Sequence, residues 1–243
     1  MKAHHAEVMQ MNDRLPNATS RTDLRLERMN WPQIADALNA GISTVIVPCG
    51  AVEQHGPHLP LFVDAEHGTI LAIEVALRLG NALVAPTIRV GCSEHHMAFP
   101  GTISLRETTF RAVCHDYCAS LTRHGFKYIC LLPAHGGNFK PLANMVNELN
   151  ASVAPVCQIA AFTDLMSVMA VWKRVVQRQN GHGDRVGGHA DIAESSLMLY
   201  LHPDLVHEEA AAAGYLPELT DAVINRIISD GLKSVTKNGI LGD

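Results

Sequence analysis

The sequence TVIVPCGAVEQHGPHLPLFVD at residues 44–64 decides the fold and carries the densest group of metal-binding side chains in the chain. Its first five residues, TVIVP at 44–48, form an apolar run that is typical of a strand buried on both faces. A polar loop follows, in which Gly56 permits a turn and two prolines restrict the backbone. The segment therefore predicts a buried strand that ends in a stiff polar loop.

This polar loop offers both oxygen and nitrogen ligands, from Glu53, His55, His58 and Asp64. Carboxylates and imidazoles together suit a borderline divalent ion such as Zn²⁺ or Mn²⁺. A polar loop after a strand is ordinary, and a single histidine there means little. Two acids and two histidines in one short loop nevertheless predict a functional site, because loops carry function more often than cores do.

The rest of the chain alternates between strand-like and helix-like segments. Strand-like apolar runs occur at 43–48, 82–87, 127–132 and 155–161, and helix-like segments at 31–40, 65–79, 107–124, 139–151 and 191–201. This alternation predicts a three-layer α/β/α fold with a mainly parallel sheet.

The remaining segments are less regular. Residues 166–176 fit a helix, 177–188 a long loop and 220–237 a closing helix. Residues 1–29 are polar, and we expect them to form a loosely held arm. Since no linker separates the rest, we expect a single domain over 30–243.

Composition limits the class of protein. Of the 243 residues, 47% are hydrophobic, which is ample for a core, and the net charge of −5 comes without a dominant basic patch, so we expect no nucleic-acid partner. No apolar run is long enough to span a membrane, and the N-terminus lacks an apolar signal segment. The six cysteines are scattered without a Cys-x-x-Cys pair. These features predict a cytoplasmic protein with reduced thiols and no membrane partner.

Further polar clusters follow the later strands, where ligands of parallel sheets bind. The clusters are Ser93-Glu94-His95-His96, then His135-Gly136-Gly137-Asn138, and finally His189 leading into a helix that carries Glu194. We expect the four polar loops to meet at one edge of the sheet.

Simpler explanations exist for each cluster taken singly. His135 before two glycines fits a helix entry, and Glu194 falls in the first turn of a helix, where the dipole favours a carboxylate. Residues 94–96 fit a solvated loop, while His58 and His67 fit the surroundings of a site better than its ligand set. The prediction of a site therefore depends on the convergence of the loops.

Other catalytic chemistries have weaker support. The chain has no Gly-x-Ser-x-Gly elbow, no Gly-x-Gly-x-x-Gly after a strand and no P-loop. Cys49, just past a predicted strand, is a conceivable thiol nucleophile, but its flanks are apolar and a stronger set of ligands follows it.

These motifs together resemble the creatininase (creatinine amidohydrolase) family. The resemblance rests on GAVEQHGPHLPL at 50–61 with Asp64, on HGGN at 135–138, on FPGT at 99–102 and on residues 188–196. It extends from about residue 30 to about residue 210, which is most of the chain.

The resemblance implies an α/β/α hydrolase that holds two divalent ions, Zn or Mn, in each subunit and often assembles as a hexamer. It implies cleavage of a C–N bond in a small cyclic or linear amide by metal-activated hydroxide. Residue by residue, it implies that Asp64 bridges the ions and that His189 is catalytic. The other implied metal ligands are Glu53, His55 and His135.

The chain departs from the family pattern at two motifs. Creatininase has a metal-binding glutamate two residues after the histidine of the third motif, where this chain has Gly137, and we expect Glu194 of the last motif to replace it. In the last motif, Asp191, Ile192 and Ser195 replace the usual glycine, glutamate and threonine. We therefore do not expect creatinine to be the substrate.

The substrate side of the site is less specified. The backbone N–H groups of Gly136 and Gly137 are candidates for holding an oxyanion, and Glu94 and His95 are candidate substrate contacts. Three alternatives stay open: a ring-ketone hydrolase that cleaves a C–C bond of an oxidised inositol (3-dehydro-scyllo-inosose type), a peptidase like the mycofactocin peptidase, and a metal-binding sensor without turnover.

Overall fold

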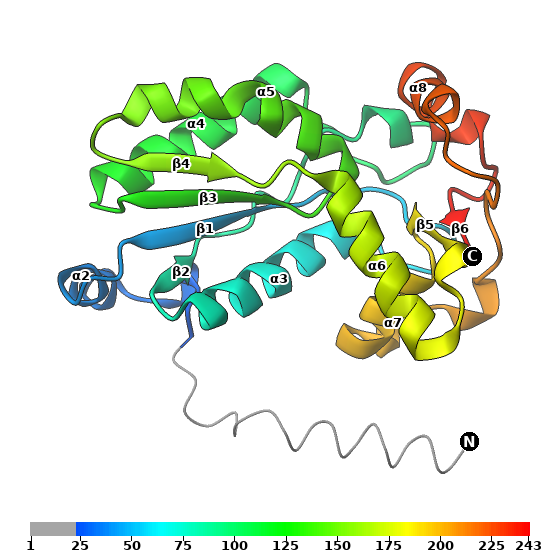
Figure 1. The fold of residues 1–243 in the computed structure, drawn as a ribbon, viewed down its shortest axis with the longest axis horizontal. Helices are drawn as coiled ribbons and strands as arrows, with labels where there is room; N and C mark the ends of the chain where they lie inside the picture. The colour runs from blue at the N-terminus through cyan, green and yellow to red at the C-terminus, as the bar shows by residue number, and fades with distance from the viewer. Residues whose placement is uncertain (1–22) are drawn as a thin grey trace, which may run out of the picture.

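The structure, a computed structural model, describes residues 23–243. Its main sheet has four parallel strands in the order β2-β1-β3-β4 (Figure 1). The strands are β1 (Thr44–Cys49), β2 (Ala82–Val84), β3 (Tyr128–Pro133) and β4 (Gln158–Ala161). The predicted mainly parallel sheet is confirmed.

Strand β1 packs against helices on both faces, as its apolar run predicts. Val45 and Val47 belong to a core cluster with residues of α4 (Glu107–Arg123) and α5 (Gly136–Val153). Ile46 belongs to a second cluster with α3 (Val63–Leu79). Because successive side chains of a strand point to opposite faces, these two clusters define the outer layers (Figure 1). The three-layer α/β/α architecture is confirmed.

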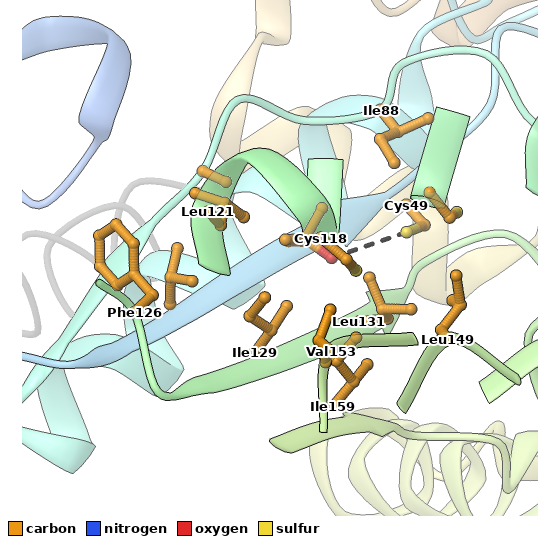
Figure 2. Close-up of a cluster of buried hydrophobic side chains, with 14 of the residues drawn as sticks. Cys49, Ile88, Cys118, Leu121, Phe126, Ile129, Leu131, Leu149, Val153 and Ile159 are labelled. Carbon is orange, nitrogen blue, oxygen red and sulfur yellow. Dashed lines mark hydrogen bonds between the residues drawn. The ribbon is translucent and has the colours of Figure 1, made fainter. Parts of the chain in front are cut away.

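Figure 2 shows the larger of the two core clusters, in which Leu121 of α4 and Leu149 of α5 pack near Ile129 and Leu131 of β3. The Cys49 thiol is buried there and donates to the Val47 carbonyl at 3.6 Å. A hydrogen bond with Cys114 and burial together raise the pKa of the Cys49 thiol. Cys49 therefore stays protonated in the core, which argues against the thiol nucleophile.

The other helices and strands surround this framework. The further α-helices are α2 (Trp31–Asn39), α6 (Leu165–Asn180), α7 (Ile192–Leu201) and α8 (Asp221–Asp230), and β5 (Val186–His189) pairs antiparallel with β6 (Leu241–Gly242). Short 3-10 helices lie at Leu26–Arg28, Glu94–His96, Gly183–Arg185, Pro203–Leu205, Glu208–Ala210 and Leu232–Ser234.

The predictions for two of the less regular segments were wrong. The predicted loop at 177–188 instead extends α6 to Asn180 and ends in β5, which gains its strand conformation by pairing with the distant β6. The predicted helix at 220–237 stops at Asp230, because Gly231 takes a φ of 81° that continues no helix. The first correction matters for the site, because β5 carries His189.

The predicted arm, residues 1–29, lies mostly outside the described residues. Its described part is packed, since Arg25 forms a parallel bridge with Val84 and Leu24 packs against both core clusters. The division into an arm and one domain stays a prediction. Between residues 23 and 243, no helix combines the length and apolar composition needed to cross a membrane.

Candidate metal centre

The carboxyl ends of the parallel strands face α7 and the small β5–β6 sheet (Figure 1). This edge collects the six side chains that the sequence predicts to be metal ligands or catalytic. All are buried, with exposed fractions of 1% for Glu53, 0% for His55, 3% for Asp64, 2% for His135, 7% for His189 and 3% for Glu194.

Three of these residues stand at the starts of helices. Asp64 lies in the first turn of α3, Glu194 lies in the first turn of α7, and His135 is the residue that precedes α5. The positive end of a helix dipole favours a carboxylate in the first turn. The helix starts therefore help to hold two acids inside a buried site.

Asp64 lies between two imidazoles. Its Oδ1 atom is 3.5 Å from His55 Nε2, and its Oδ2 atom is 3.3 Å from His135 Nδ1. Each carboxylate oxygen thus faces a different potential ligand group. Asp64 therefore lies between the two imidazoles at the middle of the buried cluster.

The remaining candidate ligands lie on the two sides of Asp64. Glu53 Oε1 lies 3.3 Å from His135 Nδ1, and Glu194 Oε2 lies 3.6 Å from His55 Nε2. Glu53, Asp64 and His135 form one set whose potential ligand atoms all lie within 4.8 Å of one another. His55, His189 and Glu194 form a second set that meets the same limit.

Backbone carbonyls orient the three histidines. His55 Nδ1 lies 3.1 Å from the Glu53 carbonyl, His135 Nε2 lies 3.0 Å from the Cys92 carbonyl, and His189 Nε2 lies 2.9 Å from the Gln54 carbonyl. A ring nitrogen that donates to a carbonyl leaves the other ring nitrogen as a free acceptor. Metal-binding histidines are usually held in this way.

Several buried atoms at the centre have no hydrogen-bond partner among the described residues. They are both carboxylate oxygens of Glu53, Nε2 of His55 and Oδ2 of Asp64. Burying an unpaired polar or charged group is costly, so such atoms call for a bound ligand. The oxygen and nitrogen donors fit divalent Zn or Mn, which accept mixed sets of this kind.

The charges of these side chains are strongly coupled. Burial opposes protonation of His55, but Asp64 and Glu194 raise its pKa to about 10. Burial raises the pKa of Glu194 to about 8. His189 behaves in the opposite way, since burial and the nearby His55 lower its pKa to about 3 and keep the ring neutral.

The residues predicted on the substrate side are placed differently. Gly136 is exposed, with open space where a side chain would stand, whereas a Cβ atom at Gly137 would lie 2.2 Å from the Cys92 carbonyl oxygen. His95 is half-buried and its ring stacks on His135 with centroids 5.8 Å apart. Glu94 is exposed.

Sequence reasoning placed His96 in one of the polar loops at this edge but not among the site residues. It is buried, with Nε2 3.3 Å from Glu53 Oε1, so treating it as a solvated loop residue was wrong. His96 also forms a third set of possible ligands with Glu53 and His189. The apolar Phe99 soon after it was a signal that this loop packs against the protein.

Comparison with known proteins agrees with this geometry. The chain is 30% identical to the mycofactocin precursor peptide peptidase of Mycolicibacterium smegmatis over 216 residues, 85% of this chain and 76% of that protein. It is 29% identical to the creatinine amidohydrolase of Pseudomonas putida, over 73% of this chain and 72% of the relative. A 28% identity to the 3-dehydro-scyllo-inosose hydrolase of Thermotoga maritima covers 81% of this chain and 63% of the relative.

A solved manganese form of creatininase superposes with a TM-score of 0.73 at 25% identity, covering 91% of this chain and 88% of that structure. The family model described as creatinine amidohydrolase matches residues 27–243. The curated relatives are hydrolases, including a creatininase and peptidases. The chain therefore belongs to the creatininase family of hydrolases.

Proposed function

We propose that this protein is a two-metal hydrolase that cleaves a C–N bond of a small cyclic or linear amide. The observation that carries the proposal is the position of Asp64, whose two oxygens face His55 and His135 separately. The relationship to a creatinine amidohydrolase and to a peptide peptidase supports amide chemistry. The substitutions around Asp191 argue against creatinine itself.

Two sets of side chains would hold the ions. Glu53, Asp64 and His135 would suit one ion. His55 and Glu194, together with Asp64, would suit the other. Zn and Mn both accept such donors. When bound, a pair of divalent ions lowers the pKa of water and polarises a carbonyl group for attack.

The chain supplies the proton transfers and the binding groups. His189 is neutral, and its Nδ1 atom lies 3.8 Å from Glu53 Oε1, at the centre. We propose that His189 accepts at Nδ1 the proton that water loses as it attacks the carbonyl carbon, and gives it to the leaving nitrogen as the C–N bond breaks. The backbone N–H groups of Gly136 and Gly137, at the start of α5, are proposed oxyanion donors.

A second candidate is hydrolysis of a ring ketone with C–C cleavage, which the relationship to the inosose hydrolase supports. In that reaction His189 would deliver its proton to carbon. We expect turnover of a cyclic or linear amide in a panel that also contains short peptides and oxidised inositols. Turnover of the inositols with no amide cleaved would favour the second candidate.

The first prediction tests the shared carboxylate. Asp64→Asn keeps the shape of the side chain but removes its charge, so we expect loss of bound metal and a drop in turnover of at least about 10³-fold. Elemental analysis, circular dichroism and assay of the purified variant measure metal, fold and rate. Asp36→Asn is the matched control, since Asp36 is exposed on α2. An Asp64→Asn protein with full metal content and activity would refute the proposal.

A further inference from the structure

The Gln54 side chain lies where the polar loop after β1, two histidines and the loop before β6 meet. It is buried, with 5% exposed. We propose that Gln54 is a positioning residue. It fixes the tautomers of His96 and His189, that is, which of the two ring nitrogens of each histidine carries the proton. The inference rests on the proposed function and deepens it, because it assigns a role to a residue that cannot itself be a strong metal ligand.

The orientation of the Gln54 carboxamide is fixed by two backbone groups. Its Oε1 atom accepts a hydrogen bond from the Gly56 N–H at 3.0 Å, and its Nε2 atom donates to the Gly239 carbonyl at 3.0 Å. A flipped amide would set two oxygens against each other and two N–H groups against each other. The amide orientation therefore follows from the hydrogen-bond partners.

The second amide proton determines the tautomer of His96. Gln54 Nε2 has two protons, and one is donated to the Gly239 carbonyl. We assign the other to His96 Nδ1, 3.0 Å away, because the remaining neighbour, His189 Nε2, faces the Gln54 backbone carbonyl and must itself donate. His96 Nδ1 must then be an acceptor. A neutral His96 consequently carries its proton on Nε2, the atom that lies 3.3 Å from Glu53 Oε1.

The backbone carbonyl of Gln54, rather than its side chain, determines the tautomer of His189. His189 Nε2 lies 2.8 Å from Gln54 Nε2 and 2.9 Å from the Gln54 backbone carbonyl. A carbonyl oxygen can only accept, so His189 Nε2 carries a proton and donates it to that carbonyl. The free acceptor of His189 is then Nδ1, the atom that faces Glu53.

The loop before β6 keeps the amide in place. Gly239 has a φ of 81°, and a Cβ atom there would lie 1.9 Å from Gln54 Oε1. Only glycine lets this backbone approach the amide so closely. The contact links residue 239 to the centre, although residue 239 is remote from it in sequence.

The test begins with the unsubstituted, metal-free protein. Long-range ¹H–¹⁵N spectra of ¹⁵N-histidine-labelled protein at about pH 8, where an ordinary imidazole is neutral, report which ring nitrogen is protonated. The His96→Gln and His189→Gln variants identify the signals. We expect Nε2–H for both rings. Nδ1–H for either ring would overturn the proposal, whatever the outcome of the activity assays.

A variant then tests the consequence for catalysis. Gln54→Met is similar in length but donates no proton, so we expect mixed tautomers of His96 and a kcat lower by about 10–100-fold, with metal content and KM little changed. Gln158→Met, at an exposed position of β4, is the control and should change neither quantity. Unaltered tautomers and an unaltered kcat in Gln54→Met would also overturn the proposal.

The two proposals fail in different ways. If the unsubstituted protein binds no metal and hydrolyses nothing, the proposed function is wrong. The histidine spectra still decide the role of Gln54 in that case, and they also decide it if Gln54→Met does not fold.

Discussion

Asp64 and His55 form part of a network in which each charge depends on the others. Burial disfavours the ionised carboxylate, but the neighbouring His55 and His135 lower the pKa of Asp64. The same acids hold protons on the imidazoles, and burial holds one on Glu194. In the absence of ions, protons neutralise this buried network. Because metal ligands must be deprotonated, binding of an ion at the candidate centre would release these protons.

This network predicts how the stability of the metal-free protein depends on pH. The pKa of His55 is raised to about 10 and that of Glu194 to about 8, so the folded protein binds more protons than the unfolded chain around neutral pH. The free energy of unfolding should therefore fall between about pH 7 and pH 9, by about 3–4 kcal/mol.

Urea denaturation of the metal-free protein at both pH values measures the change. His55→Gln should reduce the dependence, whereas a substitution of the exposed His115 should not. A free energy of unfolding that is constant or rises over this range would contradict the charge states described for His55 and Glu194.

At the scale of elements, the turn from β5 to α7 is fixed by Asp191. Its side chain is fully buried and Ala190, just before it, has a φ of 53°. Both carboxylate oxygens accept backbone N–H bonds, from Gly187 and Gly188 on one side and from Ala193 and Glu194 on the other. Asp191, which departs from the family motif, thus caps α7. It also orients His189 before it and Glu194 after it.

Removing this cap should destabilise the protein and disturb the metal centre. Asp191→Ala leaves buried N–H groups without partners, so we expect a loss of about 2–4 kcal/mol in the free energy of unfolding and weaker metal binding. Asp164→Ala, which removes the exposed cap of α6, should cost only about 0.5–1 kcal/mol and leave metal binding unchanged. Equal losses in the two variants, measured by denaturation, would argue against a special role for Asp191.

At the scale of the whole molecule, the candidate metal centre joins parts of the chain that are far apart in sequence. Glu53 and Asp64 follow β1, His135 follows β3, and His189 and Glu194 flank the turn between β5 and α7. Ions that bind only to the folded protein would therefore tie the main sheet to the β5–β6 region. The hexamer expected from the family resemblance stays a prediction.

Metal removal should consequently lower the thermal stability of the whole protein. At a free ion concentration about 100-fold above Kd, binding contributes about 2.7 kcal/mol, which corresponds to a Tm lower by about 5–10 °C after chelation. Thermal melts with EDTA, and after Mn or Zn is added back, measure the shift. Asp64→Asn should show none. If the Tm of the unsubstituted protein changes neither with EDTA nor after Mn or Zn is added back, the result would count against a bound pair of metal ions.

The main framework of the fold could be predicted from the sequence because its signals are local. The apolar run at 44–48 and the amphipathic helices between the strands encode a covered parallel sheet. Strand ends then place Glu53 and His135 at one edge, since parallel strands share a carboxyl edge. The convergence of the polar loops followed from this topology.

Other features were decided only by the tertiary structure. Val186–His189 contains two glycines and has no strand pattern of its own, and it becomes β5 because Leu241–Gly242 pairs with it. His96 is buried and Gln54 is fixed only because Gly239 and Glu53 approach them from distant parts of the chain. The hydrophobic periodicity of a sequence indicates which residues share a face of the same helix or strand. Contacts between remote segments leave no such pattern, because they depend on how the finished layers pack.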